Sequence, residues 1–555
     1  MDVDGRAALA RWEASRPDNF YEATPFLRTA LRAHLGEDGL AAIEPNLDSL
    51  GAAVAGVVEP AVAAIESRRE LPRVDADQRV AFDPEYAKAG RAVWASGVVG
   101  ASPFEQAALL YLLAHAGEGG HTCPVVCTTG LVRALRWHGS DELQQRFLAP
   151  LLETDYNRCG RGAQFLTEIQ GGSDVGANQV EAVRDGDTWR ISGEKWFCSV
   201  ADADQFVVTA RPRGAPDGTR GIGCFLVPRT VDGLPNGFTI RRLKDKLGTR
   251  VLATGEIEFN GALAYPLGPL EDGFRIAAGV VLNTSRWLNA VGSAGLMRRA
   301  YLEAAGFSRH RTAFGRPIAE FPLVRENLAI MNVEEQAALS STLELTALVD
   351  RIDAGTADEA DVTWHRILVN ANKFVTSLAA TRACRRGIEA LGGNGTIEDF
   401  SPLPRLYRDA IVFESWEGTH NVLCQQVLRD LRRLDAAGLV LERVADVDTG
   451  DLDERLGRSV ADPELGPLHI RRQLETLVHA VQAGSLRRLG ADAAAELHIR
   501  RRLTPGHDPE RDPEYPDLLD AVLADDVRER SPIGSPLRPR GRRTHAPPRP
   551  APPSA

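Results

Sequence analysis

The chain has 555 residues, which is too long for one ordinary hydrophobic core, so we expect two to four packed units. Its hydrophobic content of 43% and charged content of 25% are typical of a soluble globular protein. The net charge of −11 excludes a whole-molecule field that would attract nucleic acid or an anionic membrane. No stretch approaches the roughly 20 apolar residues that cross a bilayer.

The seven cysteines are scattered along the chain without a CxxC pair, which favours a reduced intracellular compartment. Cys123 and Cys127 lie close to His121, but no further ligand pair follows at zinc-site spacing. The first residues contain early acids and no apolar run of signal length. We therefore predict a cytoplasmic protein without a metal site.

Residues 1–160 are predicted to be mostly helical. Apolar residues recur at i, i+3 and i+4 in FLRTALRAHLG and FEQAALLYLLAHAG, and a glycine closes each segment. From residue 161 to about 273, β-rich runs such as ISGEKWFCS, QFVVTARP and IGCFLVP alternate with turn signals. This pattern is typical of antiparallel strands, so we expect a β domain inside a helical protein.

The helical period returns in residues 274–435, whose long segments predict a bundle of several helices. Shorter helical segments fill residues 436–530 and predict a helical extension. Residues 531–555 are rich in proline and arginine and cannot bury a core, so we expect them to be disordered. The chain is thus predicted to have an α+β multidomain fold.

Several loops combine glycine with polar side chains, although the sequence has no GxGxxG after a strand and no P-loop. In FLTEIQGGSDVGANQ, paired glycines let a ligand approach the backbone, while a polar turn is the simpler alternative. EALGGNG also fits a helix C-cap, and the arginines of SRHRTAFGRP also fit an exposed charged face. Taken singly, these motifs do not identify a site.

The order of the motifs is more specific. TE…GGSD, GEKWFCS, RTAFG, GGNG and WEGT follow one another as they do in the acyl-CoA dehydrogenase superfamily, which residues 80–435 resemble. The resemblance implies an N-terminal helical domain, a middle antiparallel β-barrel and a C-terminal helical bundle. PLPRLYRDAIVFESWEGTHNV, RLKDKLGTR and the terminal extensions resemble the AidB-type branch, whose members bind FAD, form tetramers and are linked to the DNA alkylation response.

The resemblance assigns the catalytic base to Glu417, which would remove the α-proton of an acyl thioester while hydride leaves for flavin N5. Trp416 would form one side of the pocket, and Gly418 would let the backbone pass close to the flavin. Some relatives carry the base on an earlier helix, immediately before an arginine. Here Ser285 precedes Arg286, so Glu417 is the matching carboxylate.

The resemblance also assigns FAD contacts. Those within one subunit are Thr167, Ser173, Phe197, Cys198, Ser199, Trp416, Gly418, Thr419 and Asn421. Arg311, Gly392 and Gly393 match residues that reach the FAD of a neighbouring subunit, which implies at least a dimer and, as in the AidB-type branch, a homotetramer.

Two functions remain open at this stage. One is FAD-dependent dehydrogenation of an acyl-CoA-like substrate whose acyl group and electron acceptor the sequence does not specify; an oxidase that passes electrons to oxygen is a lesser option. The alternative is a DNA-associated flavoprotein with weak or vestigial dehydrogenase activity. Residues 441–530 carry 13 Arg against 20 Asp plus Glu, so a nonspecific DNA contact would depend on local patches at HIRRQLETLVHAVQAGSLRRL and LHIRRRL or on the five arginines of residues 531–555.

Overall fold

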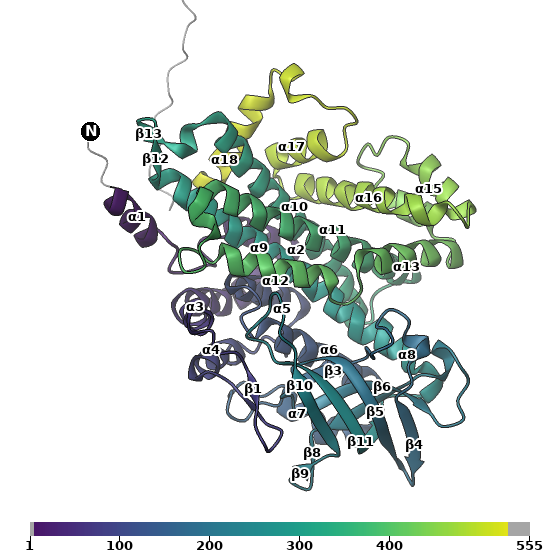
Figure 1. Ribbon diagram of the computed structural model, residues 1–555. Helices are drawn as coiled ribbons and strands as arrows, with labels where there is room; N and C mark the ends of the chain where they lie inside the picture. Colours follow the sequence, from purple (N-terminus) through teal and green to yellow (C-terminus); the bar gives the residue numbers. More distant parts are fainter. Residues whose placement is uncertain (1–4, 531–555) are drawn as a thin grey trace, which may run out of the picture.

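The computed structural model describes residues 5–530 (Figure 1), so the predicted disordered tail at 531–555 lies outside the described residues. Helices make up most of the chain up to Leu151, apart from a hairpin of β1 (Arg73–Val74) and β2 (Val80–Ala81). They are α1 (Gly5–Ala14), α2 (Pro25–Ala53), α3 (Glu59–Arg68), α4 (Pro84–Ala95), α5 (Pro103–Leu113), α6 (Thr122–His138) and α7 (Asp141–Leu151).

The helical stretch Pro25–Arg68, which combines α2, α3 and a π-helical turn between them, is long and apolar enough to cross a membrane by length and composition. An 18-residue window within it has a mean hydropathy of 1.4. Acidic residues and Pro45 interrupt its sequence, so it contains no unbroken apolar run of membrane-spanning length. In the structure, buried side chains such as Leu27, Leu31 and Leu47 belong to the main hydrophobic core. Packing against the rest of the protein therefore accounts for part of its composition, since 39% of that window is buried.

The middle of the chain forms a closed β-barrel. Its strands are β3 (Gly162–Phe165), β4 (Glu181–Asp185), β5 (Thr188–Ser199), β6 (Gln205–Pro212), β7 (Gly223–Pro228), β10 (Phe238–Leu243) and β11 (Thr254–Pro266), with a small hairpin of β8 (Thr230–Val231) and β9 (Leu234–Pro235). The sheet runs β10-β11-β5-β4-β6-β3, and β7 closes it by pairing with both β6 and β11. The predicted barrel is confirmed.

The expectation of a purely antiparallel barrel needs one correction, because β6 pairs in parallel with both β3 and β4. Gly162 lies opposite Gln205 in the first pair, and Glu181 lies opposite Arg211 in the second. Parallel neighbours need a long crossover connection, and the loop after β3 together with the β4–β5 hairpin provides it. This detour places the residues after β3 in a loop between β3 and β4.

The C-terminal bundle is built from α9 (Asn283–His310), α10 (Pro322–Asp353), α11 (Glu359–Leu391), α12 (Leu403–Ser415) and α13 (His420–Arg433). The short α8 (Gly273–Ile276) and a π-helical turn, Ala277–Leu282, lead from the barrel into α9. Most of α9 is buried on every side, which explains its lack of an amphipathic pattern.

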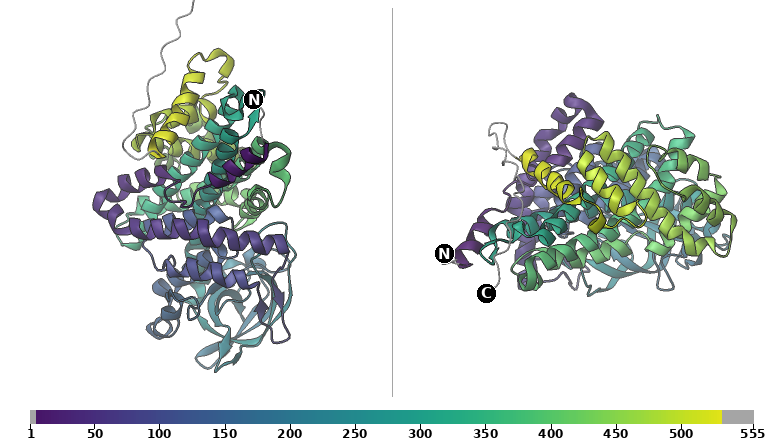
Figure 2. Two further views of the ribbon diagram at one scale, coloured as in Figure 1. Left: turned by 90° about the vertical axis from the view of Figure 1, so that its left-hand side faces the viewer. Right: turned by 90° about the horizontal axis from the view of Figure 1, so that it is seen from above.

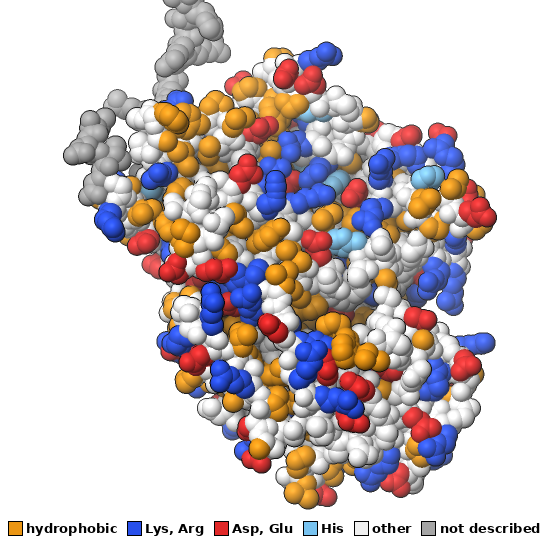
Figure 3. All heavy atoms as spheres, in the orientation of Figure 1, with side chains coloured by type: hydrophobic (Ala, Val, Ile, Leu, Met, Phe, Trp, Pro, Cys, Tyr) orange, Lys and Arg blue, Asp and Glu red, His pale blue; other side chains and the backbone are white. Residues whose placement is uncertain are grey.

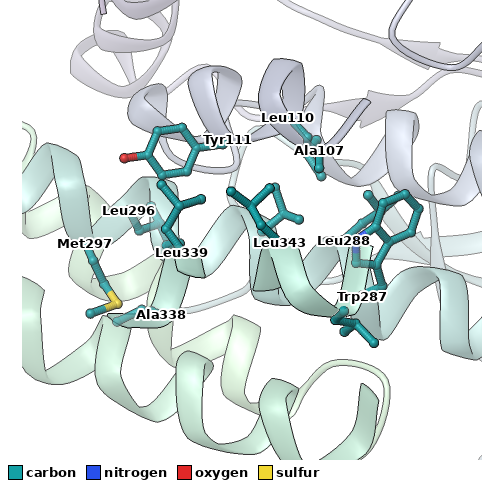
Figure 4. Packing of buried hydrophobic residues seen from close by; sticks show 14 of the residues in the cluster. Ala107, Leu110, Tyr111, Trp287, Leu288, Leu296, Met297, Ala338, Leu339 and Leu343 are labelled. Carbon is teal, nitrogen blue, oxygen red and sulfur yellow. The ribbon is translucent and has the colours of Figure 1, made fainter. Parts of the chain in front are cut away.

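The N-terminal helices and the bundle share one core. Figure 4 shows α5 side chains, including Leu110 and Tyr111, lying against α9 and α10. Two polar groups inside this layer are satisfied: the Tyr111 hydroxyl donates to Glu335 over 2.7 Å, and the Trp287 indole donates to Thr346 over 2.9 Å. A second core fills the barrel, and Trp416 packs against both.

The extension after residue 436 consists of α14 (Ala437–Glu442), α15 (Leu452–Ala461), α16 (Gly466–Arg488), α17 (Asp492–Arg502) and α18 (Tyr515–Arg530). Figures 1 and 2 show these helices lying across the bundle on the side away from the barrel. α16 packs against α10, α11 and α13, and its side chains Leu474, Leu477 and Val478 belong to the main core. The extension is therefore an integral layer of the bundle.

Because the extension and the bundle share a core, we expect them to unfold together. Leu474→Ala, at a side chain that is 1% exposed, should lower the free energy of unfolding by about 2–5 kcal/mol. Leu468→Ala, on an exposed face of the same helix, should change it by less than about 0.5 kcal/mol. Denaturant unfolding followed by circular dichroism measures both, and a separate early transition of the extension would contradict the shared core.

Candidate active site

The turn between α12 and α13 places Glu417 at the junction of the two cores. α12 ends at Ser415, α13 begins at His420, and Trp416 stacks on Phe413 with ring centroids 5.1 Å apart. Glu417 adopts a left-handed backbone conformation with φ 56°, which a bulky side chain rarely takes. Such strain of about 1–3 kcal/mol persists where the surroundings enforce it, and it is common at functional sites.

Two buried cations hold this turn through its backbone. Arg286 of α9 donates from Nε to the Glu417 carbonyl over 2.9 Å. Lys373 of α11 donates from Nζ to the carbonyls of Glu414 (2.9 Å) and Gly418 (3.1 Å). Because both cations are almost fully buried, burial lowers the pKa of Arg286 to about 10 and that of Lys373 to about 7.

The side chain of Glu417 points to the barrel. Gln164, on β3, donates from Nε2 to Glu417 Oε1 over 2.7 Å. The same nitrogen lies 3.1 Å from the hydroxyl of Ser285 on α9. Residues 285 and 417 are the two positions at which the resemblance places a base. Both contact Gln164, and here only Glu417 provides a carboxylate.

The surroundings of Glu417 favour its protonated form. The residue keeps partial exposure, yet dense protein around the carboxylate raises its pKa to about 7. The charges of Arg286 and Lys373 and the hydrogen bond from Gln164 oppose this rise without cancelling it. A carboxyl group that ionises near neutral pH is suited to act as a general base.

The barrel also carries an exposed aromatic side chain on β5. Phe197, on β5, is 54% exposed, and the ammonium of Lys244 lies over both its ring and that of Trp196. Ser199 Oγ lies 3.2 Å from the Thr254 hydroxyl. Figure 3 shows hydrophobic side chains on the barrel side of a hollow between barrel and bundle.

The loop that carries Thr167 and Ser173 is tied to the same strand. The Trp196 amide donates to the Thr167 carbonyl over 2.9 Å, and the next residue, Glu168, forms a buried ion pair with Lys195 over 2.7 Å. A Cβ at Gly172 would lie 2.7 Å from the Thr167 hydroxyl, so glycine is required there. Ser173 is exposed at the loop tip.

Two predicted cofactor residues have surroundings that the sequence did not indicate. The Cys198 side chain is fully buried in the barrel core, so only its backbone remains available to a ligand outside the barrel. Asn421 accepts a hydrogen bond from Arg471 of α16, which brings the extension to the first turn of α13. Thr419 is exposed before that helix and does not cap it.

Arg311, Gly392 and Gly393 lie at the other end of the bundle. α9 and α11 run in parallel: Arg286 and Lys373 meet at the Glu417 turn, and a Cβ at Gly387 would lie 3.3 Å from the Ala300 carbonyl, equally far along both helices. At 1.5 Å per residue, Arg311 is about 37 Å beyond Arg286 along the helix axis. These three residues cannot reach the Glu417 turn of their own chain.

The arginines of LHIRRRL do not form a free basic patch. Arg500 makes ion pairs with Glu496, Asp512 and Glu514, and Arg502 pairs with Glu334. These acids neutralise the charge that phosphate binding requires. The predicted nonspecific DNA contact stays a prediction, which would use HIRRQLETLVHAVQAGSLRRL or the arginines of residues 531–555, and the latter lie outside the described residues.

The sequence reading missed Gln164 and Lys373 as parts of the site. Lys373 is one of five lysines in the chain and the only charged residue in the stretch ILVNANKFVTSLAA of a long helix, so the sequence did contain a signal for a buried role. Gln164 offered no comparable signal, because an isolated glutamine in a strand is ordinary.

Gly418 is required by its own backbone, with φ 105°. Gly418→Ala should lower the free energy of unfolding by about 1–3 kcal/mol, because this conformation is strained for any residue with a Cβ. That Cβ would also lie 3.3 Å from Leu423. Gly438→Ala, in the helix α14 and with no atom within 4 Å of the added Cβ, should be neutral or slightly stabilising. Thermal unfolding measures both, and equal stability of Gly418→Ala and wild type would disprove the strain.

Comparison with known proteins identifies the family of the chain. The profile of the acyl-CoA dehydrogenase middle domain matches residues 163–262, and that of the C-terminal domain matches residues 271–432. Acyl-CoA dehydrogenase family member 11 of Caenorhabditis elegans is 33% identical over 441 residues, which cover 74% of this chain and 70% of that protein. The putative acyl-CoA dehydrogenase AidB of Escherichia coli (strain K12) is 35% identical over 327 residues, 57% of this chain and 58% of that protein.

Among solved structures, Caenorhabditis elegans ACDH-11 in complex with C11-CoA has the same fold, with a TM-score of 0.78 and 27% identity over 92% of this chain and 94% of that chain. The similarity thus extends beyond the domains that the profiles match and includes the extension. The chain belongs to the acyl-CoA dehydrogenase superfamily, whose members use FAD.

Proposed function

We propose that the protein is an FAD-dependent dehydrogenase that removes hydrogen from the α and β carbons of an acyl-CoA-like thioester, with Glu417 as the base. The observation that carries this proposal is the Glu417 carboxylate, which is held on the bundle, points to the barrel through the 2.7 Å contact with Gln164, and has a pKa of about 7. A relative solved with C11-CoA supports a CoA thioester as the substrate class.

The residues at the junction fit FAD. Phe197, Ile169 and Leu247 are large apolar side chains that are more than half exposed on the barrel side, and a flat aromatic ring system would cover such a surface. The glycine loop offers a close backbone approach at Gly171, where no atom lies within 4 Å of an added Cβ. When bound, FAD would supply the hydride acceptor.

Glu417 would accept the α-proton of the thioester. Only the ionised carboxylate can do this, and a carboxylate whose burial raises its pKa is a stronger base than one in water. Within the described part of the chain, the Glu417 amide hydrogen has no acceptor. This N–H is thus available to the thioester oxygen, where negative charge develops as the proton leaves.

Glu417→Gln should retain FAD and lose at least about 100-fold in the rate of anaerobic flavin bleaching by an acyl-CoA panel, because the amide cannot accept the proton. In the wild type, this rate should rise with pH and reach half its maximum near pH 7, since the carboxylate is ionised only above its pKa. Stopped-flow absorbance measures both.

Glu414→Gln is the matched control, because its side chain accepts from Thr381 of α11 rather than facing the barrel. It should bleach like the wild type. If no acyl-CoA in the panel bleaches the wild-type flavin, or if Glu417→Gln bleaches normally, the proposed dehydrogenase function is wrong. Peroxide released during turnover would instead identify oxygen as the electron acceptor.

We further propose that a second subunit completes each site. Arg311 and the turn at Gly392 and Gly393 are exposed at the end of the bundle opposite Glu417. Phe314, which is 97% exposed, follows Arg311 closely, and Leu323 is also exposed at the start of α10. An apolar group beside an arginine fits an interface at which a neighbouring subunit's FAD diphosphate is bound.

Phe314→Ser should lower the assembly mass and weaken FAD retention together, because the apolar contact between subunits is lost. Light scattering after gel filtration gives the mass, and flavin absorbance in the same peak gives the occupancy. Leu468→Ser, which also removes a large exposed apolar side chain but lies on the extension, should alter neither. An unchanged mass for Phe314→Ser would place the subunit contact elsewhere.

A further inference from the structure

A short chain of hydrogen bonds links the start of α9 to the Glu417 carboxylate. Ser285 Oγ lies 3.2 Å from the carbonyl of Val281 in the π-helical turn. Gln164 Nε2 lies 3.1 Å from Ser285 Oγ and 2.7 Å from Glu417 Oε1. One glutamine of the barrel thus contacts two different segments of the bundle.

The chemistry of these groups determines which atom donates in each of these hydrogen bonds. The Val281 carbonyl can only accept, so it takes the hydrogen of the Ser285 hydroxyl. Ser285 Oγ can then accept one hydrogen of the Gln164 amide, and the second hydrogen goes to Glu417. The opposite arrangement, in which Ser285 donates to Gln164 Oε1, is longer at 3.3 Å. The network therefore presents N–H, not C=O, to Glu417.

An N–H donor suits an ionised carboxylate, because that group only accepts hydrogen bonds. The other groups that face Glu417 act differently. Arg286 on α9 and Lys373 on α11 donate to backbone carbonyls of the turn, and Cys123 on α6 has a pKa raised well above its usual value by its contact with Cys127 and by burial. Among the described residues, Gln164 alone donates a side-chain hydrogen bond to the Glu417 carboxylate.

We propose that Gln164 is a positioning residue for the base: its amide, oriented by Ser285, directs the Glu417 carboxylate toward the barrel and keeps it ready to accept a proton. This inference rests on the proposed role of Glu417. The cations fix the backbone of the turn, whereas Gln164 fixes the end of the side chain. A side chain of similar length without a donor would leave the carboxylate unsupported in a buried setting.

Gln164→Met keeps the reach of the side chain and removes the donor. The pH midpoint of anaerobic flavin bleaching should then move up by about one to two units, because burial is no longer opposed by this hydrogen bond. The carboxyl infrared band that disappears in Glu417→Gln should titrate with the same shift in protein without substrate. Ser285→Ala should shift both in the same direction by less, since it only frees the orientation of the amide.

Two matched controls separate this role from general damage to the fold. Gln205→Met alters a buried glutamine on β6, next to β3, whose amide donates to the Phe147 carbonyl. Ser293→Ala alters a fully buried serine further along α9. Neither contacts Glu417, and neither should move the midpoint. Ser285→Ala keeps the test decisive if Gln164→Met does not fold.

The outcomes also distinguish this inference from the proposed function. If Glu417→Gln abolishes bleaching while Gln164→Met and Ser285→Ala leave both midpoints unchanged, Glu417 is the base and the role of Gln164 is wrong. A uniform loss of rate at every pH, with no shift of the infrared titration, would also overturn it. If Glu417→Gln bleaches normally, the proposed function fails.

Discussion

The strained turn at Glu417 is the constraint on which the site depends. A left-handed glutamate is unfavourable by itself, and it persists because Arg286 bonds its own carbonyl while Lys373 bonds the carbonyls of Glu414 and Gly418. Had either cation paired directly with the carboxylate, the pKa of Glu417 would fall and its strength as a base with it. The cations act on the backbone, so the side chain keeps a pKa of about 7.

Lys373 also stabilises the C-terminal end of α12. The last carbonyls of a helix have no partner within it, and they carry the negative end of its dipole. Lys373 satisfies one of them, at Glu414, and continues to Gly418 beyond the turn. A buried lysine is costly without such partners. Its place in the core is thus explained by helix termination as well as by the site.

The order of domains could be predicted because each depends on local patterns: helical periods, alternating strands and the motif order around WEGT. Cys198 illustrates a signal that was present and not used. Side chains alternate along a strand, so an outward Phe197 that contacts a ligand already implies an inward Cys198. The contact between Arg471 and Asn421 could not be predicted, because it depends on how α16 docks across a long sequence separation.

The Gln164–Glu417 contact also joins two units that pack around separate cores. The barrel carries Gln164 and Phe197, the bundle carries Glu417, and Trp416 packs against both cores. The position of the base relative to the barrel surface is therefore set by packing between units rather than by any one element. A hydrogen bond weakens steeply as its length and angle depart from the ideal. A shift of the barrel that lengthens this contact would withdraw the donor and raise the pKa of Glu417, so the protonation state of the base depends on how closely the two units are packed.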